Sequence, residues 1–317
     1  MQLDDVGVVV LNYMTIEAPK EMIGSLKKLY PNVRTLIADN GSPANVIEEL
    51  EEFCGQLNNT SVLQLGYNYG YSKGMNAGIK KLREEGYEYI CCSISHMLIN
   101  ENGLLESLKN SLDNKNAAVA GPRIITSSGR EENPFRIKRP SPSQAKKIYD
   151  KYGSSLRNIN ALKKQLFNNL KEKVRPESNR FLVKPLKKLV RFLLAEPKVI
   201  NNMAKEEKRD QHSHEYYVYS LHGSIIMFGP QFFQHYAGFD ETTFLYNDEY
   251  IVSEMLLAKN LKAVYNPKCR VLHREDITSR LVWKDKREKM VDKHRKVSVK
   301  HWYYNHYLKN NRQIKNL

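Results

Sequence analysis

The 317-residue chain has few cysteines and no long apolar run. Its 4 cysteines lack the Cys-x-x-Cys spacing of redox and zinc sites and are too sparse for a disulfide framework. No apolar stretch approaches the roughly 18 residues that a membrane span needs. Residues 1–5 also lack the basic and apolar segments of a signal peptide. These absences predict a cytoplasmic globular protein with reduced thiols.

Acidic residues are scarce in two segments of the chain. Between Arg136 and Lys198 there are 18 Lys and Arg against 4 Asp and Glu, and from Arg280 to the end there are 12 against 3. Because the whole chain has a net charge of +15, the remaining residues are net acidic. Two basic segments on an acidic body favour an anionic partner, either a membrane leaflet or nucleic acid, although a solvated basic face is the simpler alternative.

Strands and helices alternate over the first 125 residues. Continuous apolar runs predict buried strands, and segments with helical apolar spacing lie between them. We expect strands at 6–11, 33–39, 62–65, 89–94 and 117–125, and helices at 19–29, 46–54, 72–84 and 101–112. Strands that alternate with helices predict an α/β fold with a mostly parallel, Rossmann-like sheet flanked by helices.

The alternation ends after residue 125. Residues 127–142 are rich in Ser, Pro and charge and predict a mobile loop, and residues 144–194 predict lysine-rich helix. Within that segment, residues 181–194 place leucines on one face and lysines on another, as in a helix lying on a membrane surface or packing on the protein body. Further on we expect a strand at 216–228, a helix at 248–259, extended pieces at 261–265 and 270–273, and a helical tail at 284–308.

The helical tail carries a cluster of aromatic residues beside its lysines. Rings in such surroundings favour a lipid headgroup region, although the same cluster could close the core of the protein itself. The aromatic residues are Trp302, Tyr303, Tyr304 and Tyr307.

Polar turns follow the apolar strands where α/β proteins place their ligands. Asn12 follows the first strand, and Asp39 opens an Asp-Asn-Gly-Ser turn after the second. Residues 68–79 contain three glycines that permit close backbone approach, and Asp248-Glu249 lies at a turn-to-helix junction. Each motif has a local alternative, because Asp can stabilise a turn, glycines can serve helix packing and acids can cap a helix.

Four ordered segments resemble the inverting family 2 glycosyltransferases, particularly the bacterial rhamnosyltransferase-like and capsule or O-antigen branches. They are residues 8–13, 37–42, 68–79 and 238–249, followed by Val-Leu-His at 271–273. The resemblance implies a GT-A fold and a UDP- or dTDP-sugar donor. It makes residues 1–130 the nucleotide-sugar-binding half, 131–214 a basic helical insert, 215–279 the acceptor-binding and catalytic half, and 280–317 a basic aromatic tail.

The resemblance also assigns roles to individual residues. Asp39 would recognise the base, and Glu249 would act as general base toward the acceptor hydroxyl. Asp248 would orient the acceptor or take the catalytic role itself, and Asp240 and Glu241 would build the turn that aims the pair. The expected donor-binding residues are Leu11, Asn12, Tyr13, Asp39, Gly41, Asn68, Gly70, Gly74, Asn76, Ser95 and Arg123.

The chain departs from the family pattern at the metal site. The resemblance implies a metal-binding Asp after the fourth strand, where this chain has His96. His96 and His273 could hold a divalent ion, and imidazole suits Mn²⁺ better than Mg²⁺. Two alternatives stay open: a metal-independent enzyme in which Arg123, Arg274 or Lys73 neutralises the diphosphate, or a weak or inactive protein that binds nucleotide sugars or scaffolds polysaccharide assembly.

We therefore expect a bacterial hexosyltransferase at the cytoplasmic face of the cell membrane, attached peripherally. Its acceptor would be a lipid-linked or surface polysaccharide, and the basic insert and tail would bind the anionic leaflet or the acceptor's diphosphate. We expect no nucleic-acid partner, because no nucleic-acid-binding motif accompanies the basic segments. The sequence leaves the formation of a homo-oligomer open.

Overall fold

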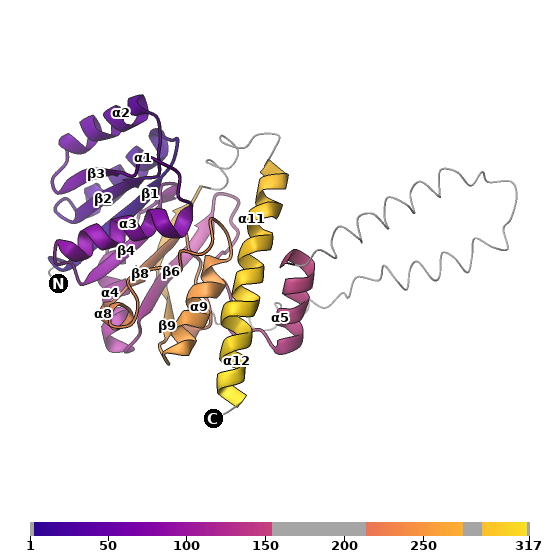
Figure 1. Cartoon of the computed structure of the whole chain (residues 1–317). Coiled ribbons are helices and arrows are strands. Elements are labelled where there is room, and N and C mark those ends of the chain that lie inside the picture. Colours follow the sequence, from indigo (N-terminus) through magenta and orange to yellow (C-terminus); the bar gives the residue numbers. More distant parts are fainter. Residues whose placement is uncertain (1–2, 154–213, 275–286, 316–317) are drawn as a thin grey trace, which may run out of the picture. The chain divides into compact units, whose positions relative to one another are not determined.

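One mixed β-sheet organises the described part of the chain. The computed structural model describes residues 3–153, 214–274 and 287–315 (Figure 1). Its nine-stranded sheet has the order β3-β2-β1-β4-β8-β6-β9-β5, with β7 paired to β9. The pairs β3–β2, β2–β1, β1–β4 and β6–β9 are parallel, while β8, β5 and β7 pair antiparallel. The predicted α/β fold with a mostly parallel sheet is confirmed.

The strands are β1 (Val6–Asn12), β2 (Arg34–Asp39), β3 (Thr60–Gln64), β4 (Tyr89–Ile94), β5 (Met97–Leu98), β6 (Val119–Thr126), β7 (Tyr216–Val218), β8 (Ile225–Phe228) and β9 (Ala263–His273). The α-helices are α1 (Glu17–Leu29), α2 (Ala44–Gly55), α3 (Tyr71–Glu84), α4 (Leu104–Asn114), α5 (Pro142–Ile148), α8 (Pro230–Phe233), α9 (Asp248–Ala258), α11 (Arg287–His301) and α12 (Leu308–Lys315). Two π-helical turns are η1 (Tyr149–Gly153) and η3 (Trp302–Tyr307).

Helices cover both faces of the sheet because its central strands are apolar on both sides. In β1, Val8 and Val10 pack into the core shared with α1, α2 and α4. Val9 points the other way, into the core shared with α3, α9 and η3. Successive side chains of a strand alternate between faces, so one continuous apolar run fills both cores. Figure 1 shows α3, α9 and α11 over the same face of the sheet.

Three segments differ in detail from the predictions. The strand expected at 216–228 is interrupted, because residues 219–224 leave the sheet between β7 and β8. The extended pieces expected at 261–265 and 270–273 belong to one strand, β9, whose pairing with β6 shifts register between Pro122 and Arg123. The loop expected to be mobile is anchored, because Arg136 and Ser220 exchange two backbone hydrogen bonds of 3.0 and 2.8 Å.

The aromatic tail closes the core of the protein. Trp302 and Tyr307 are 0% and 1% exposed, and Trp302 stacks on Tyr250 with ring centroids 5.0 Å apart. Of the aromatic cluster, Tyr304 remains exposed. The prediction that these rings face lipid headgroups is therefore wrong for the buried members, and their alternative role in the core is confirmed.

None of the helices in the described ranges is long and apolar enough to cross a bilayer. The basic segment predicted at 144–194 falls largely outside these ranges, as does the whole of its amphipathic part at 181–194.

A buried ion pair joins the tail to the rest of the molecule. Glu254 of α9 is fully buried and accepts two hydrogen bonds of 2.8 Å from Arg139. Its carboxylate also accepts from Tyr219 at 2.7 Å and from Asn310 of α12 at 2.8 Å. Four donors on one carboxylate compensate for the loss of its hydration. This network fixes α9, the helix that begins with the acidic pair.

We expect Arg139→Ala to lower the free energy of unfolding by about 3–5 kcal/mol, because it leaves the Glu254 charge buried without its cation. Urea denaturation followed by circular dichroism measures this change. The matched control is Lys146→Ala, which removes an exposed pair with Asp150 and should cost much less, because solvent screens exposed ion pairs. Equal losses in the two variants would contradict a special role for the buried pair.

Candidate functional site

The turn after β2 is built around a buried carboxylate. Asp39 is 0% exposed. Its Oδ2 accepts from Asn12 Nδ2 at 2.9 Å and from Ser42 Oγ at 2.8 Å, and its Oδ1 accepts from the Ser42 backbone N–H at 2.7 Å. Ser42 Oγ in turn accepts from the backbone N–H of Met14 at 2.7 Å. Asp39 thus ties the carboxyl ends of β1 and β2 together, and its direct contact with a base stays a prediction.

The next residue, Asn40, connects this turn to the glycine-rich segment before α3. Asn40 Nδ2 donates to the Gly70 carbonyl at 2.9 Å and to Asn68 Oδ1 at 3.1 Å. Gly70 has φ +87°, and a Cβ there would lie 2.2 Å from the Phe244 carbonyl oxygen. Only glycine fits such a close approach at positive φ. The loop that the sequence assigned to the donor is therefore shaped by contacts with the segment that precedes α9.

The acidic pair lies against the first turn of α3. The backbone N–H of Tyr71 donates to the Phe244 carbonyl at 2.8 Å, and Ser72 Oγ donates to Asp248 Oδ1 at 2.6 Å. Tyr71 Oη donates to the Gly223 carbonyl at 2.5 Å, and Glu249 Oε1 lies 3.5 Å from the position of a Cβ at Gly223. Distant segments of the chain thus meet at one place.

The two acids of the pair have different surroundings. Asp248 is 7% exposed, and burial, followed by the neighbouring charge of Glu249, raises the pKa of Asp248 to about 7. Its hydrogen bond from Ser72 acts in the opposite direction and is outweighed. Glu249 is half-buried. Of the two, Glu249 is the less buried carboxylate, while Asp248 is held inside the protein.

The backbone just before the pair is strained. Tyr246 and Asn247 have φ of 71° and 68°, a conformation that is uncommon for residues with side chains. The Asn247 Nδ2 amide is buried and has no hydrogen-bond partner among the described residues. Strain and an unsatisfied donor are costly and are found together at ligand-binding sites. Both features single out the start of α9.

Other predicted donor residues have local roles in this structure. Gly74 packs α3 against β1, because a Cβ there would lie 2.7 Å from Leu11 Cδ1. Asn76 Nδ2 donates to the Phe239 carbonyl and to Glu241 Oε1, each at 2.9 Å, and so holds the turn before the acidic pair. Their direct contact with a donor stays a prediction.

Gly41, like Gly70, is a position that favours glycine, because its φ is +87° and a Cβ there would lie 2.6 Å from the Tyr67 carbonyl carbon. Tyr13 is half-buried just beyond β1. Arg123 of β6 donates to Glu131, which lies in the loop after that strand, and forms an ion pair with it. Whether Tyr13 or Arg123 contacts a donor also stays a prediction.

The two predicted metal ligands lie near each other at the ends of β4 and β9. The rings of His96 and His273 are 6.2 Å apart and nearly parallel, and His222 lies 6.0 Å from His273. His273 Nδ1 is 2.5 Å from Glu132 Oε2, while Ser95 Oγ lies 3.2 Å from His96 Nδ1. Carboxylates suit Mn²⁺, whereas imidazole is the better ligand for zinc, copper, iron or nickel. In the described part of the chain, His96 and His273 do not belong to a group of three converging ligand atoms, so their role as ligands stays a prediction.

Hydrogen bonds and burial define the states of His222 and Glu132. Burial lowers the pKa of His222, and Ser224 donates its backbone N–H to His222 Nδ1 at 3.2 Å, so this imidazole is neutral. For Glu132, burial is outweighed by the hydrogen bond from His273 and the nearby basic groups, which together lower its pKa. Glu132 is thus a charged carboxylate beside the histidines.

The sequence motifs pointed to some of these residues and missed others. Ser72 lies inside the glycine-rich motif but was not singled out, and His222 lies in a segment expected to be strand. Glu132 lies in the loop after β6, where no pattern marks it. Only the folding of this loop against residues 219–222 brings Glu132 to the histidines.

Comparisons with known proteins agree on the kind of fold. The family model described as Glycosyl transferase family 2 matches residues 6–175. A comparison with curated protein sequences finds no match.

Three solved structures are similar to this chain at low sequence identity. Staphylococcus aureus TarS (residues 1–349) has a TM-score of 0.48 at 14% identity, over 85% of this chain and 60% of that one. GalNAc-T7, solved with UDP, GalNAc and Mn²⁺, has a TM-score of 0.52 at 11% identity, over 86% and 43%. The mannosyltransferase PcManGT of Pyrobaculum calidifontis, solved with GDP-Man and Mn²⁺, has 0.50 at 10% identity, over 94% and 69%. The chain thus spans less than two thirds of the length of the first two. The likeness to GalNAc-T7 and PcManGT supports a GT-A-like fold.

We expect Asp248→Asn to stabilise the protein relative to the wild type as the pH rises. Since the folded-state pKa of Asp248 is raised to about 7 from its usual 3.8, the wild type loses stability between about pH 4 and 7, because the unfolded chain releases this proton while the buried group still holds it. Asparagine stays neutral throughout. Melting temperatures of both proteins between pH 5 and 8 should therefore diverge in favour of the variant, and a difference that does not change with pH would contradict the raised pKa.

Proposed function

The chain belongs to glycosyl transferase family 2, and from this premise we propose that it is an inverting glycosyltransferase. In this proposal it transfers a hexose from a UDP- or dTDP-sugar to a lipid-linked or surface polysaccharide acceptor. GalNAc-T7 and PcManGT, which share its fold, were solved with nucleotides or a nucleotide sugar and Mn²⁺. They support a nucleotide-sugar donor here. The choice of UDP or dTDP as the nucleotide goes beyond this support and is part of the proposal.

One observation carries the proposal: the predicted donor loop and the acidic pair are joined through the start of α3. Asn40 holds the Gly70 carbonyl at 2.9 Å, and two residues later Ser72 holds Asp248 at 2.6 Å. A short stretch of backbone therefore separates the turn after β2 from the acids of α9. An inverting transfer needs this neighbourhood, because a base must reach the acceptor hydroxyl while that hydroxyl attacks the donor sugar.

In the proposed reaction Glu249 is the general base. It removes the proton of the acceptor hydroxyl as the oxygen attacks the anomeric carbon on the side opposite the nucleoside diphosphate. Asp248 keeps the start of α9 against Ser72 and, when ionised, raises the basicity of its neighbour. The bond broken is the one between the sugar and the diphosphate, which leaves with its negative charge.

The leaving diphosphate needs a counter-charge, for which we propose a Mn²⁺ ion held by His96 and His273. The ion would neutralise the diphosphate oxygens when bound. Two of the cations that could replace it are engaged elsewhere, because Arg274 pairs with Glu21 and Arg123 pairs with Glu131. These pairs favour a metal-dependent enzyme over neutralisation by either arginine.

We further propose that the basic insert places the enzyme on the cytoplasmic leaflet of a bacterial membrane. The 18 basic residues between Arg136 and Lys198 support an anionic partner, and a lipid-linked acceptor would present its diphosphate at the same surface. Attachment of this kind is peripheral and electrostatic, and it is expected to weaken with salt.

We expect Glu249→Gln to lower kcat by about 10²–10⁴-fold and to leave donor binding intact, because glutamine keeps the shape but cannot accept the proton. Turnover should be assayed with UDP- and dTDP-sugars in the presence of Mn²⁺ and of EDTA, and donor affinity by calorimetry. Glu52→Gln, an exposed acid on α2, serves as the control.

Full activity of Glu249→Gln would refute the assignment of the base. Donor binding without turnover by the wild type, across all donors and acceptors tried, would favour an inactive nucleotide-sugar-binding protein.

We expect binding to anionic vesicles to fall about tenfold or more when Lys184, Lys187 and Lys188 are changed to glutamine, since each lysine near a charged leaflet contributes about 1 kcal/mol. Vesicle sedimentation at increasing salt measures this. Changing the exposed Lys28, Lys80 and Lys259 to glutamine gives the charge-matched control. If both triple variants lose binding equally, the insert is not the membrane contact.

A further inference from the structure

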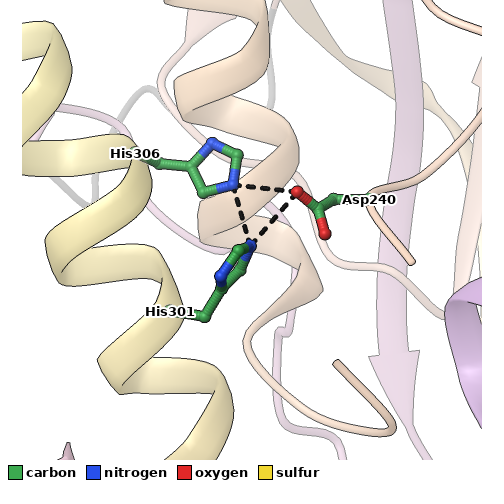
Figure 2. Close-up of side chains that lie close together, drawn as sticks. All are labelled: Asp240, His301 and His306. Atoms are coloured by element: carbon green, nitrogen blue, oxygen red, sulfur yellow. Dashed lines mark hydrogen bonds and ion pairs between the residues drawn. The ribbon is translucent and has the colours of Figure 1, made fainter. Parts of the chain in front are cut away.

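A second group of potential metal ligands lies away from the proposed transfer site. Asp240, in the turn before α9, faces His301 at the end of α11 and His306 in η3 (Figure 2). Asp240 Oδ2 lies 3.1 Å from His301 Nε2 and 3.0 Å from His306 Nε2, and the two Nε2 atoms are 3.2 Å apart. Three ligand atoms from two distant parts of the chain thus converge on one point.

The spacing of these atoms matches that of ligands around a small divalent ion. A zinc ion with ligands at about 2.05 Å holds them about 3.3 Å apart in a tetrahedron, and about 2.9 Å apart in an octahedron. The observed 3.0, 3.1 and 3.2 Å fall between these two values. Hydrogen bonds alone account poorly for this arrangement. If both histidines donated an N–H to the same oxygen of Asp240, their two Nε2–H groups would also point at each other.

The π-helical turn η3 is what brings the two histidines together. In an α-helix, residues five apart are rotated by about 140° from each other and point to different sides. A π-helix joins residues five apart by its hydrogen bonds, so that His301 and His306 can lie on one side. Such turns are rare and are frequently found at functional sites. The widened turn Trp302–Tyr307 is therefore an independent indication of a ligand.

Neighbouring groups hold two of the three side chains in place. Thr242 donates its backbone N–H to Asp240 Oδ1 at 2.8 Å, which leaves Oδ2 for the histidines. The Asn305 amide lies 3.1 Å from His301 Nδ1. The contacting atom is the amide nitrogen Nδ2. Turning the Asn305 amide over would place its oxygen there to accept from Nδ1–H, which leaves the lone pair of Nε2 facing the cluster, as metal-binding histidines require.

The charge of the cluster also suits a cation. Asp240 supplies a carboxylate oxygen, and His301 and His306 each supply an imidazole nitrogen, so the cluster offers one anionic and two lone-pair ligands. A depression beside the cluster is lined by Asp240, His306 and Lys309 and leaves room for water as a further ligand. Two imidazoles, one carboxylate and a water in the fourth position would complete a tetrahedral zinc site.

We propose that Asp240, His301 and His306 bind one Zn²⁺ ion, which fastens the carboxy-terminal helices to the turn that precedes the acidic pair. Asn76 of α3 holds the same turn from its other side, through the Phe239 backbone. The ion would thus fix the turn between the helix that borders the donor loop and the tail that packs on α9. Its role is structural, and it is separate from any ion at the diphosphate.

The test uses the full chain without a histidine tag, stripped of metal and titrated with ZnCl₂ by calorimetry. We expect saturable Zn²⁺ binding and a higher melting temperature. His301→Gln and His306→Gln should each weaken this binding at least tenfold and abolish the rise in melting temperature. In the wild type, Co²⁺ should give the visible absorption of a site with two nitrogen ligands, and in both variants that absorption should be lost.

Two controls separate this site from other histidines. His235→Gln removes an exposed histidine outside the cluster and should bind like the wild type. His273→Gln alters the proposed diphosphate site and should keep the Zn²⁺-dependent rise in melting temperature. Unchanged binding in both cluster variants, absence of saturable binding, or loss of the effect in His273→Gln alone would overturn the proposal. Because the readouts are binding and stability, they do not depend on the proposed transfer reaction.

Discussion

The hydrogen bond from Ser72 to Asp248 is the contact on which the site depends. It joins residues 176 positions apart and brings the amino-terminal ends of α3 and α9 together. A helix amino terminus favours negative charge, yet burial outweighs this effect at Asp248 and leaves its pKa raised. Asp248 is therefore held inside the protein, while its neighbour Glu249 is half-buried. The proposed division of roles between the two acids rests on this difference in burial.

The position of α9 depends equally on the carboxy-terminal segment. Glu254, on the same helix as the acidic pair, is held by Arg139 and Asn310, and Trp302 stacks on Tyr250. The turn before α9 is in turn held by α3 and faces the histidines of α11 and η3 (Figure 2). The tail is thus part of the wall that supports the site, which explains why its aromatic residues are buried.

The sequence predicted the sheet well where a strand is apolar throughout. The strand expected at 89–94 is β4, and those expected at 6–11 and 33–39 differ from β1 and β2 by one residue. Periodicity could not show that residues 219–224 leave the sheet, because the segment is apolar on both sides of its Ser-Leu-His-Gly-Ser turn. Nor could periodicity distinguish a buried aromatic cluster from a membrane-facing one, since aromatic rings beside lysines are compatible with either environment.

By itself the sequence determined the alternation of strands and helices, the polar turns at the strand ends and the acidic pair at the start of α9, because these are local patterns. Only the tertiary structure decided that Asp39 points inward to Asn12 and Ser42, that Asn76 holds a turn, and that Glu132 joins the histidines. The tertiary structure likewise brings Asp240 close to His301 and His306. Burial and hydrogen bonds between distant segments set these roles, and neither is encoded in the spacing of nearby residues.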